Sequence, residues 1–265
     1  MSHDEGQPFR GFVACAALML TQAATGLLVP SLYRDPQPWV LSAWRGNDVV
    51  TLVVAVPVLL WSTWRARAGS VRGLLLALGA LWYCFYNDAY YLFGAALGPA
   101  FPLYSVLMVT CAVTLVVAVS RLDWPRVTSA FARAPARPVA GVLVFVGVVL
   151  ALVWFAQWAA YIWTGRIDRI GPEAVRLIAA MDTVVIAPSL VFGGVLLWRR
   201  RPAGFVLATL GATLGGGYAL VLVGGTLAAA AAGLPGMELL PLWLGLAVVL
   251  LGALGALLWR VEATS

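Results

Sequence analysis

The chain has 265 residues, of which 62% are hydrophobic and only 11% are charged, and this composition excludes a soluble globular domain. The net charge of +6 comes from 17 basic residues, all arginine, which in so apolar a chain record membrane topology rather than nucleic-acid binding. The single histidine, His3, excludes a histidine-ligated haem, a histidine zinc site and a Ser-His-Asp triad within this sequence.

Eight apolar segments, each near the roughly 20 residues that a membrane-spanning helix needs, follow one another in chain order. They cover residues 11–31, 47–64, 72–94, 101–120, 138–163, 182–198, 203–228 and 238–259. These long runs lack the alternation of a membrane β-barrel, so we expect an all-α polytopic membrane protein with eight transmembrane helices. The first segment follows Arg10 and resembles a signal peptide, but we interpret it as a retained helix because the internal repeat requires it.

The loops between these segments carry unequal numbers of arginines. The N-terminus, the C-terminus and the loops at 65–72, 121–137 and 199–201 together hold 12. The alternate loops, near 34–45, 95–100, 165–176 and 229–237, hold 5. By the positive-inside rule, both termini are predicted to be cytoplasmic, in the cell (inner) membrane.

Two segments resemble each other and predict an internal repeat. The sequence NDVVTLVVAVPVLLWSTWRARAG (47–69) parallels MDTVVIAPSLVFGGVLLWRRRPAG (181–204), and an offset of 134 pairs Asp48 with Asp182 and Trp64 with Trp198. We therefore expect two parallel four-helix repeats, 1–120 and 138–265, joined by an arginine-rich cytoplasmic linker at 121–137. The prolines that should kink these helices follow the two aspartates by nine and six residues, which argues against one strictly repeated motif.

Three aspartates lie at similar distances from the predicted cytoplasmic loops. Asp48 precedes Arg65 by 17 residues, Asp88 follows Arg72 by 16, and Asp182 precedes Arg199 by 17. At about 1.5 Å per residue, all three fall in the outer third of a hydrocarbon core of about 30 Å. Because Asp48 and Asp182 begin predicted helices, capping of the helix N-terminus is their simplest role.

Asp88 lies well inside its predicted helix, where an aspartate costs about 2.5–3.5 kcal/mol on insertion scales. We therefore expect it to face the bundle interior with Arg45 or Asp48 as a polar partner. Its helix contains the polar, aromatic stretch WYCFYNDAYYLFG (82–94). The candidate acid–base or proton-coupling residues are Asp88, Asp48 and Asp182, and the candidate binding residues are Arg45, Asn47, Tyr83, Tyr86, Asn87, Tyr91 and Tyr218.

Other conspicuous side chains have simpler interpretations. The tyrosine stripe of 83, 86 and 90 fits an interfacial aromatic belt as well as a ligand pocket. The stripe formed by Trp154, Trp158 and Tyr161 with Gln157 is interpreted as belt or packing. The cysteines lie in apolar runs without metal-ligand spacing, which is typical of core residues: Cys15, Cys84 and Cys111.

These features predict a protein with a polar, aromatic cavity open to the outer leaflet, which binds or processes an apolar or amphipathic small molecule or lipid. Acid–base chemistry by carboxylates, such as isomerisation or cyclisation, would suit the residues present, since Walker A, GxSxG and HExxH motifs are absent. A proton-coupled transporter and a non-catalytic sensor or partner subunit are the alternatives. We expect membrane lipids as partners, no nucleic acid, no cofactor and no metal. Small-residue faces at Gly94/Gly98 and Gly211/Gly215 are compatible with a homo-oligomer.

Overall fold

The computed structural model describes residues 7–167, 171–259 and 261, and these contain helices but no strand. His3 and two of the arginines counted above, Arg169 and Arg260, lie outside the described residues. The α-helices are α1 (Gln7–Leu28), α2 (Pro38–Val50), α3 (Val56–Arg67), α4 (Val71–Gly94), α5 (Phe101–Ser120), α6 (Trp124–Ala130), α7 (Ala136–Thr164), α8 (Pro172–Met181), α9 (Ala187–Trp198), α10 (Pro202–Ala231) and α11 (Leu240–Trp259). Short 3₁₀ helices are η1 (Pro30–Leu32) and η4 (Met237–Leu239), and π-helical turns are η2 (Thr51–Ala55) and η3 (Asp182–Ile186).

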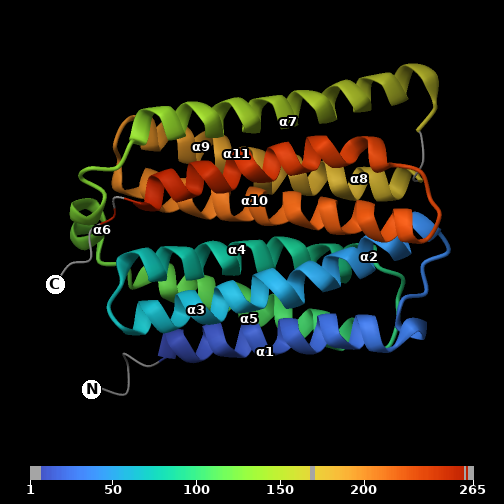
Figure 1. Cartoon of the computed structure of the whole chain (residues 1–265), viewed down its shortest axis with the longest axis horizontal. Coiled ribbons are helices and arrows are strands. Elements are labelled where there is room, and N and C mark those ends of the chain that lie inside the picture. Colours follow the sequence, from blue (N-terminus) through green and yellow to red (C-terminus); the bar gives the residue numbers. More distant parts are fainter. Residues whose placement is uncertain (1–6, 168–170, 260, 262–265) are drawn as a thin grey trace.

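In this part of the chain, seven helical stretches are long and apolar enough to cross a membrane, which confirms the prediction of an all-α polytopic membrane protein. They are Phe9–Leu28, Pro38–Arg67, Phe101–Ser120, Ala136–Thr164, Pro172–Trp198, Pro202–Ala231 and Met237–Trp259. The remaining predicted segment forms α4, whose 24 residues include several tyrosines, Asn87 and Asp88 and are therefore less apolar. It nevertheless runs alongside the other long helices (Figure 1) and packs against α3, α5 and α10.

Two of the spans begin about ten residues earlier than predicted. α2, η2 and α3 form the continuous stretch Pro38–Arg67, and α8, η3 and α9 form Pro172–Trp198. A proline starts each of them, as is common in the first helical turn. Asp48 and Asp182 therefore lie ten residues inside their helices, and the interpretation of both as N-terminal caps is wrong.

Each of these spans contains a π-helical turn directly before a proline. The N–H of Val56 bonds to the carbonyl of Thr51, and the N–H of Ala187 bonds to that of Asp182. A proline follows each of these donors and can supply no hydrogen bond of its own, so the wider turn relieves the disrupted ladder. The two prolines therefore occupy the same position relative to the π-turns, whereas Asp182 starts its π-turn and Asp48 lies three residues before the other one.

The bounds of the two hairpins, α3–α4 and α9–α10, match at a spacing of 131 rather than the predicted 134. The π-turns start at Thr51 and Asp182. Helices α3 and α9 end at Arg67 and Trp198, and α4 and α10 start at residues 71 and 202. At the hairpins, Trp198 therefore corresponds to Arg67 rather than to Trp64, whereas the spans start at Pro38 and Pro172, which are 134 residues apart as predicted. Asp48 and Asp182 each lie ten residues after the start of their spans, but Asp182 lies in its π-turn and Asp48 lies three residues before its own.

Glycines at the two hairpins support the same spacing. A Cβ added to Gly73 would meet the backbone of Ala66 at 2.8 Å, and one added to Gly204 would collide with the backbone of Leu197. These positions also differ by 131, so both hairpins use a glycine to let their helices approach closely.

The long helices fall into two groups with the same cyclic order of contacts. In the first group α1 packs on α3, α3 on α4, α4 on α5, and α5 on α1, while α7, α9, α10 and α11 repeat this order. The groups meet mainly where α10 packs against α2 and α4, whereas α8 touches α4 only lightly. α1 begins and α11 ends at the same end of the bundle, beside α6 (Figure 1).

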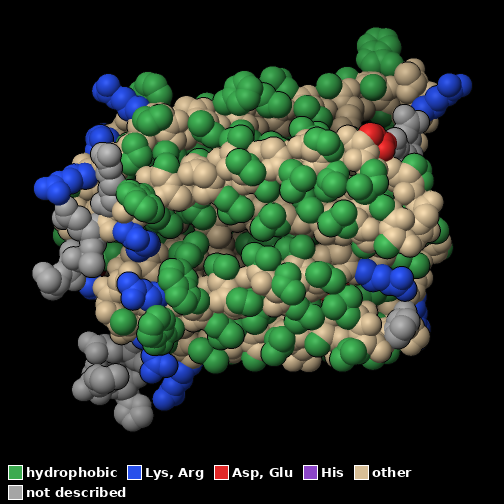
Figure 2. Space-filling model, in the orientation of Figure 1, with side chains coloured by type: hydrophobic (Ala, Val, Ile, Leu, Met, Phe, Trp, Pro, Cys, Tyr) green, Lys and Arg blue, Asp and Glu red, His purple; other side chains and the backbone are tan. Residues whose placement is uncertain are grey.

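Arginines gather at that end, while apolar side chains cover the middle of the bundle (Figure 2). We call it the arginine-rich end; it contains the α3–α4 and α9–α10 hairpins and α6. The other end, which contains η1, η4 and the α7–α8 connection, is called the opposite end. This separation of charge and apolar surface matches the pattern of a protein whose middle lies in lipid.

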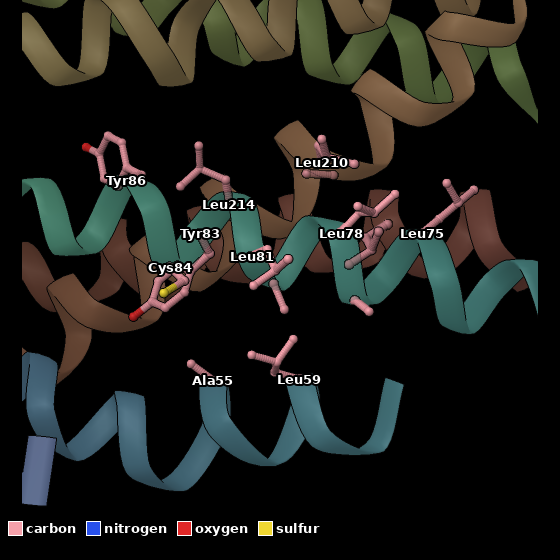
Figure 3. Packing of buried hydrophobic residues seen from close by; sticks show 14 of the residues in the cluster. Ala55, Leu59, Leu75, Leu78, Leu81, Tyr83, Cys84, Tyr86, Leu210 and Leu214 are labelled. Carbon is pink, nitrogen blue, oxygen red and sulfur yellow. The ribbon is translucent and has the colours of Figure 1, made fainter. Parts of the chain in front are cut away.

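The core is built from leucines and small residues where α10 meets the first group. Leu59, Leu75, Leu78 and Leu81 are fully buried, and side chains of α3, α4 and α10 meet there (Figure 3). A Cβ on Gly46 would collide with the backbone at Gly224, so α2 and α10 cross in direct backbone contact.

The glycine faces suggested for oligomerisation are largely used within the chain. Gly211 approaches the backbone of Ser189 in α9, Gly215 approaches Leu250 in α11, and Gly94 approaches Leu177 in α8. These three glycines therefore serve packing inside one chain.

Candidate functional site

Asp48 lies in a cage of tyrosine hydroxyls near the opposite end. The Tyr33 hydroxyl donates to Oδ2 at 2.6 Å and the Tyr91 hydroxyl donates to Oδ1 at 2.8 Å. The carboxylate is 1% exposed, and a side chain on Gly26 of α1 would collide with it. Burial and the neighbouring Asp48 carboxylate raise the pKa of the Tyr33 phenol above its ordinary value, so Tyr33 remains a donor.

An aromatic stack closes this cage toward the opposite end. Trp44 lies 4.6 Å from Tyr91 between ring centroids and also stacks on Tyr33. The Trp44 indole N–H donates to Asp35 at 2.9 Å, and Asp35 also accepts the backbone N–H of Ala96. These bonds connect the loop after α1 to α2 and to the end of α4. The connected loop covers Asp48.

Asp182 has a second cage, formed from both halves of the chain. The Tyr86 hydroxyl donates to Oδ1, and the indole N–H of Trp154 donates to Oδ2 at 2.8 Å. Tyr86 in turn bonds to the Tyr90 hydroxyl at 2.7 Å, and Tyr218 packs on both tyrosine rings. This carboxylate is 4% exposed, and its hydrogen bonds join α4 and α7 to the π-turn η3.

Asn87 connects α4 to α2. Its Oδ1 accepts a hydrogen bond of 2.8 Å from the Asn47 side-chain amide, and the Asn47 Oδ1 accepts one from the Tyr83 hydroxyl at 3.5 Å. All three side chains are buried. The adjacent residues Asn87 and Asp88 therefore have different environments, because only Asn87 is hydrogen-bonded to a neighbouring helix.

Asp88 faces the bundle interior as predicted, with 1% of its surface exposed. Neither of its carboxyl oxygens has a hydrogen-bond partner. The prediction that Asp48 or Arg45 would be its partner is wrong, because Asp48 is held by two tyrosines and the Arg45 side chain is exposed. The helix register explains this, since α2 turns Asp48 toward Tyr91 and Arg45 toward the outside.

A groove of about 550 Å³ lies between the outer parts of α7 and α8, away from Asp88. We call it the α7–α8 groove. α7 slants away from the bundle toward its C-terminal end (Figure 1). Aromatic side chains line the groove together with four polar ones: Trp154, Phe155, Trp158, Tyr161, Gln157, Glu173, Arg176 and Thr183. The same Trp154 that lines it also binds Asp182.

The candidate residues predicted from the sequence are thus distributed over several environments. Asp48 and Tyr91 belong to one cage, Asp182, Tyr86 and Tyr218 to the other, and Asn47, Tyr83 and Asn87 to the link between α2 and α4. None of them lines the α7–α8 groove.

Two residues that hold the aspartates were not predicted from the sequence: Tyr33 donates to Asp48, and Trp154, interpreted as belt or packing, donates to Asp182. The aromatic stripe of α7 lies in the C-terminal part of this helix, which slants away from the bundle (Figure 1). Tyr33 follows the apolar run of the first segment, where no periodicity could assign it a neighbour.

Within the described residues, no group of three or more histidine, cysteine, aspartate or glutamate side chains could hold a metal ion. The three cysteines are buried and unbridged, as predicted for core residues. No known protein family, curated protein or solved structure matches this chain. Function must therefore be argued from the site itself.

Proposed function

We propose that the protein binds a lipid-like amphipathic molecule in the α7–α8 groove. The observation that carries the proposal is the composition of this groove, which combines several aromatic rings with a few polar side chains at one end of an apolar bundle. Its volume of about 550 Å³ lies within the range of small-molecule sites. Phe155, Trp158 and Ile162 are largely exposed, so a molecule in surrounding lipid can reach the groove from the side.

The charges of the groove favour a zwitterionic polar head. Glu173 and Arg176 stand one turn apart on α8, both are exposed, and both line the groove. A cationic group would be attracted by Glu173 and by the faces of Trp158 and Tyr161. A phosphate would be attracted by Arg176. The apolar chain of the ligand would lie on Trp154 and Phe155, toward the middle of the bundle.

We further propose that the arginine-rich end is cytoplasmic and that the protein lies in the cell (inner) membrane. The unequal distribution of arginines between the two ends supports this orientation. The α7–α8 groove then opens to the outer leaflet. This assignment keeps the outer-leaflet ligand site predicted from the sequence but moves it from α4 to α7 and α8.

The same proposal includes eight transmembrane helices arranged as two parallel repeats, with α4 as the most buried span. The shared cyclic order of contacts, the paired π-turns and the spacing of 131 between the hairpins support it. The repeats would comprise residues 1–120 and 138–265, with α6 in the linker. Their asymmetry would be functional, because the groove is lined by α7 and not by its counterpart α1.

A groove-filling substitution tests the proposed function. We expect native mass spectrometry of the purified protein, supplied with lysophosphatidylethanolamine, to show one bound lipid per chain. Ala180→Trp, in the groove wall, should abolish this binding. Val184→Trp places the same side chain one turn away at a position that is 72% exposed and outside the groove, and it should bind like the wild type.

Binding of lysophosphatidylethanolamine to Ala180→Trp at the wild-type level would overturn the proposed site. A comparison with lysophosphatidylglycerol tests the charge argument separately. This anionic lipid lacks the cationic group, so it should bind more weakly than the zwitterionic one. Equal binding of the two lipids would contradict the zwitterionic assignment.

A further inference from the structure

One buried carboxyl group has no role in the groove or in the two cages. Asp48 and Asp182 each accept two hydrogen bonds, from hydroxyl or indole donors. Asp88 is equally buried but accepts none at either oxygen. An unpartnered polar atom in a core costs free energy, and an unpaired charge costs far more, so this difference requires an explanation.

The surroundings of Asp88 contain sulfur and one phenol but no cation. The titratable groups close to its carboxyl group are Cys15 of α1, Cys84 of α4 and Tyr104 of α5. Cys111 of α5 interacts with both of the other thiols and donates to the Leu81 carbonyl at 3.1 Å. Among the described residues, no arginine side chain and no second carboxyl group forms a hydrogen bond with Asp88.

A proton is the ligand that best suits the carboxyl group of Asp88 in these surroundings. Burying an ionised, unpaired carboxylate costs at least several kcal/mol even after relaxation, so the group neutralises instead. A hard cation such as Ca²⁺ or Mg²⁺ takes about six or more oxygen ligands, and Asp88 offers a single carboxyl group among thiols. The described residues also contain no group of side chains suited to a metal.

We propose that Asp88 is a proton-binding site: its carboxyl group is uncharged in the closed bundle and loses its proton only when α1 and α5 separate from α4. Asp88 and the three cysteines are each 1% exposed or less, so the closed packing seals the site from water. This proposal is independent of the molecule that the groove binds. It gives the protein a site at which an opening of the first helix group is coupled to proton release.

Infrared spectroscopy of the full-length protein tests the protonation state. A protonated carboxyl group gives a C=O band that is separate from the bands of ionised carboxylates. We expect this band in the wild type at neutral pH, with a component that is lost in Asp88→Asn and persists in Asp48→Asn. Asp88→Glu should move the band without removing it, which identifies the residue even if the asparagine variant folds poorly. A protonated-carboxyl band that is unchanged in both Asp88 variants would overturn the proposal.

The rate of exchange in D₂O tests the second half of the proposal. A side chain on Gly11 of α1 would collide with Thr114 of α5, one turn from Cys15 and Cys111. Gly11→Val should therefore loosen the seal and speed the isotope shift of the Asp88 band at least tenfold. Gly252→Val in α11, where nothing lies within 4 Å of an added Cβ, should exchange at the wild-type rate. Equal rates in the Gly11 variant and the wild type would contradict release by helix separation.

Discussion

At the scale of single residues, the buried aspartates differ in what their neighbours donate. Tyr91 and Tyr104 are both buried tyrosines whose rings pack together, with centroids 5.3 Å apart, but only Tyr91 donates to Asp48. A hydrogen bond to a charged group contributes about 1.5–3 kcal/mol, and loss of the donor leaves the carboxylate less satisfied. The hydroxyl of Tyr91, rather than its ring alone, therefore stabilises this end of the bundle.

We predict that Tyr91→Phe lowers the free energy of unfolding by about 2 kcal/mol, whereas Tyr104→Phe lowers it by less than about 1 kcal/mol. Thermal unfolding in detergent, followed by circular dichroism, measures both variants. The two substitutions remove the same hydroxyl group from neighbouring rings. Equal losses of stability would show that the hydrogen bond to Asp48 contributes nothing specific.

The sequence alone could not reveal that the adjacent residues Asn87 and Asp88 have different environments. Hydropathy and the insertion cost of an aspartate correctly predicted that Asp88 faces inward. The choice of partner depended on the rotation of α2, which no pattern in the sequence specifies. As a result the prediction gave Asp88 a partner on α2, Asp48 or Arg45, whereas it is Asn87 that bonds to α2, through Asn47, and Asp88 has no hydrogen-bond partner.

At the scale of elements, apolar length predicted where helices run but not where they begin. Arg45, Glu173 and Arg176 interrupt the apolar character of the early turns of their spans, so the predicted starts were placed after them. Pro38 and Pro172 were better signals of the true starts. The spacing between the corresponding elements is 134 residues at the span starts, Pro38 and Pro172, as predicted, but 131 residues at the hairpins.

The crossing of α2 and α10 depends on the absence of a side chain at Gly46. Gly46 meets the backbone of α10 directly, so even one added methyl group forces the two helices apart. Overpacking of this kind costs about 1–3 kcal/mol. We expect Gly46→Ala to lower the unfolding midpoint of the purified protein, and Gly245→Ala, where an added Cβ meets nothing within 4 Å, to leave it unchanged. An unchanged midpoint in the Gly46 variant would contradict the close approach of α2 and α10.

At the scale of the whole molecule, the orientation in the membrane follows from the arginines. Reporter fusions after Arg67, Arg126 and Arg200 should report the cytoplasm, and fusions near Pro99 and Pro235 should report the outside. Alkaline phosphatase and green fluorescent protein give opposite signals on the two sides and serve as mutual controls. A cytoplasmic signal at Pro99 would refute the proposed orientation and the count of eight spans together.

The position of the α7–α8 groove could not have been predicted from the sequence. The aromatic stripe of α7 is equally compatible with a membrane interface, and only the slant of α7 away from the bundle (Figure 1) exposes it beside α8. The cavity was instead expected around α4, whose tyrosines are in fact buried in the two aspartate cages and the link to α2. A polar aromatic helix in a membrane protein can thus serve the packing of two helix groups rather than a ligand.

The most direct test of ligand binding is photo-crosslinking in living membranes. A photoreactive phenylalanine analogue at Phe155 lies in the α7–α8 groove, and the same analogue at Phe192 lies on a lipid-exposed position of α9. We predict that position 155 captures one dominant amphipathic molecule of defined mass, whereas position 192 captures the mixed lipids of the bilayer. The same mixture of adducts at both positions would contradict the proposal that this groove is a binding site.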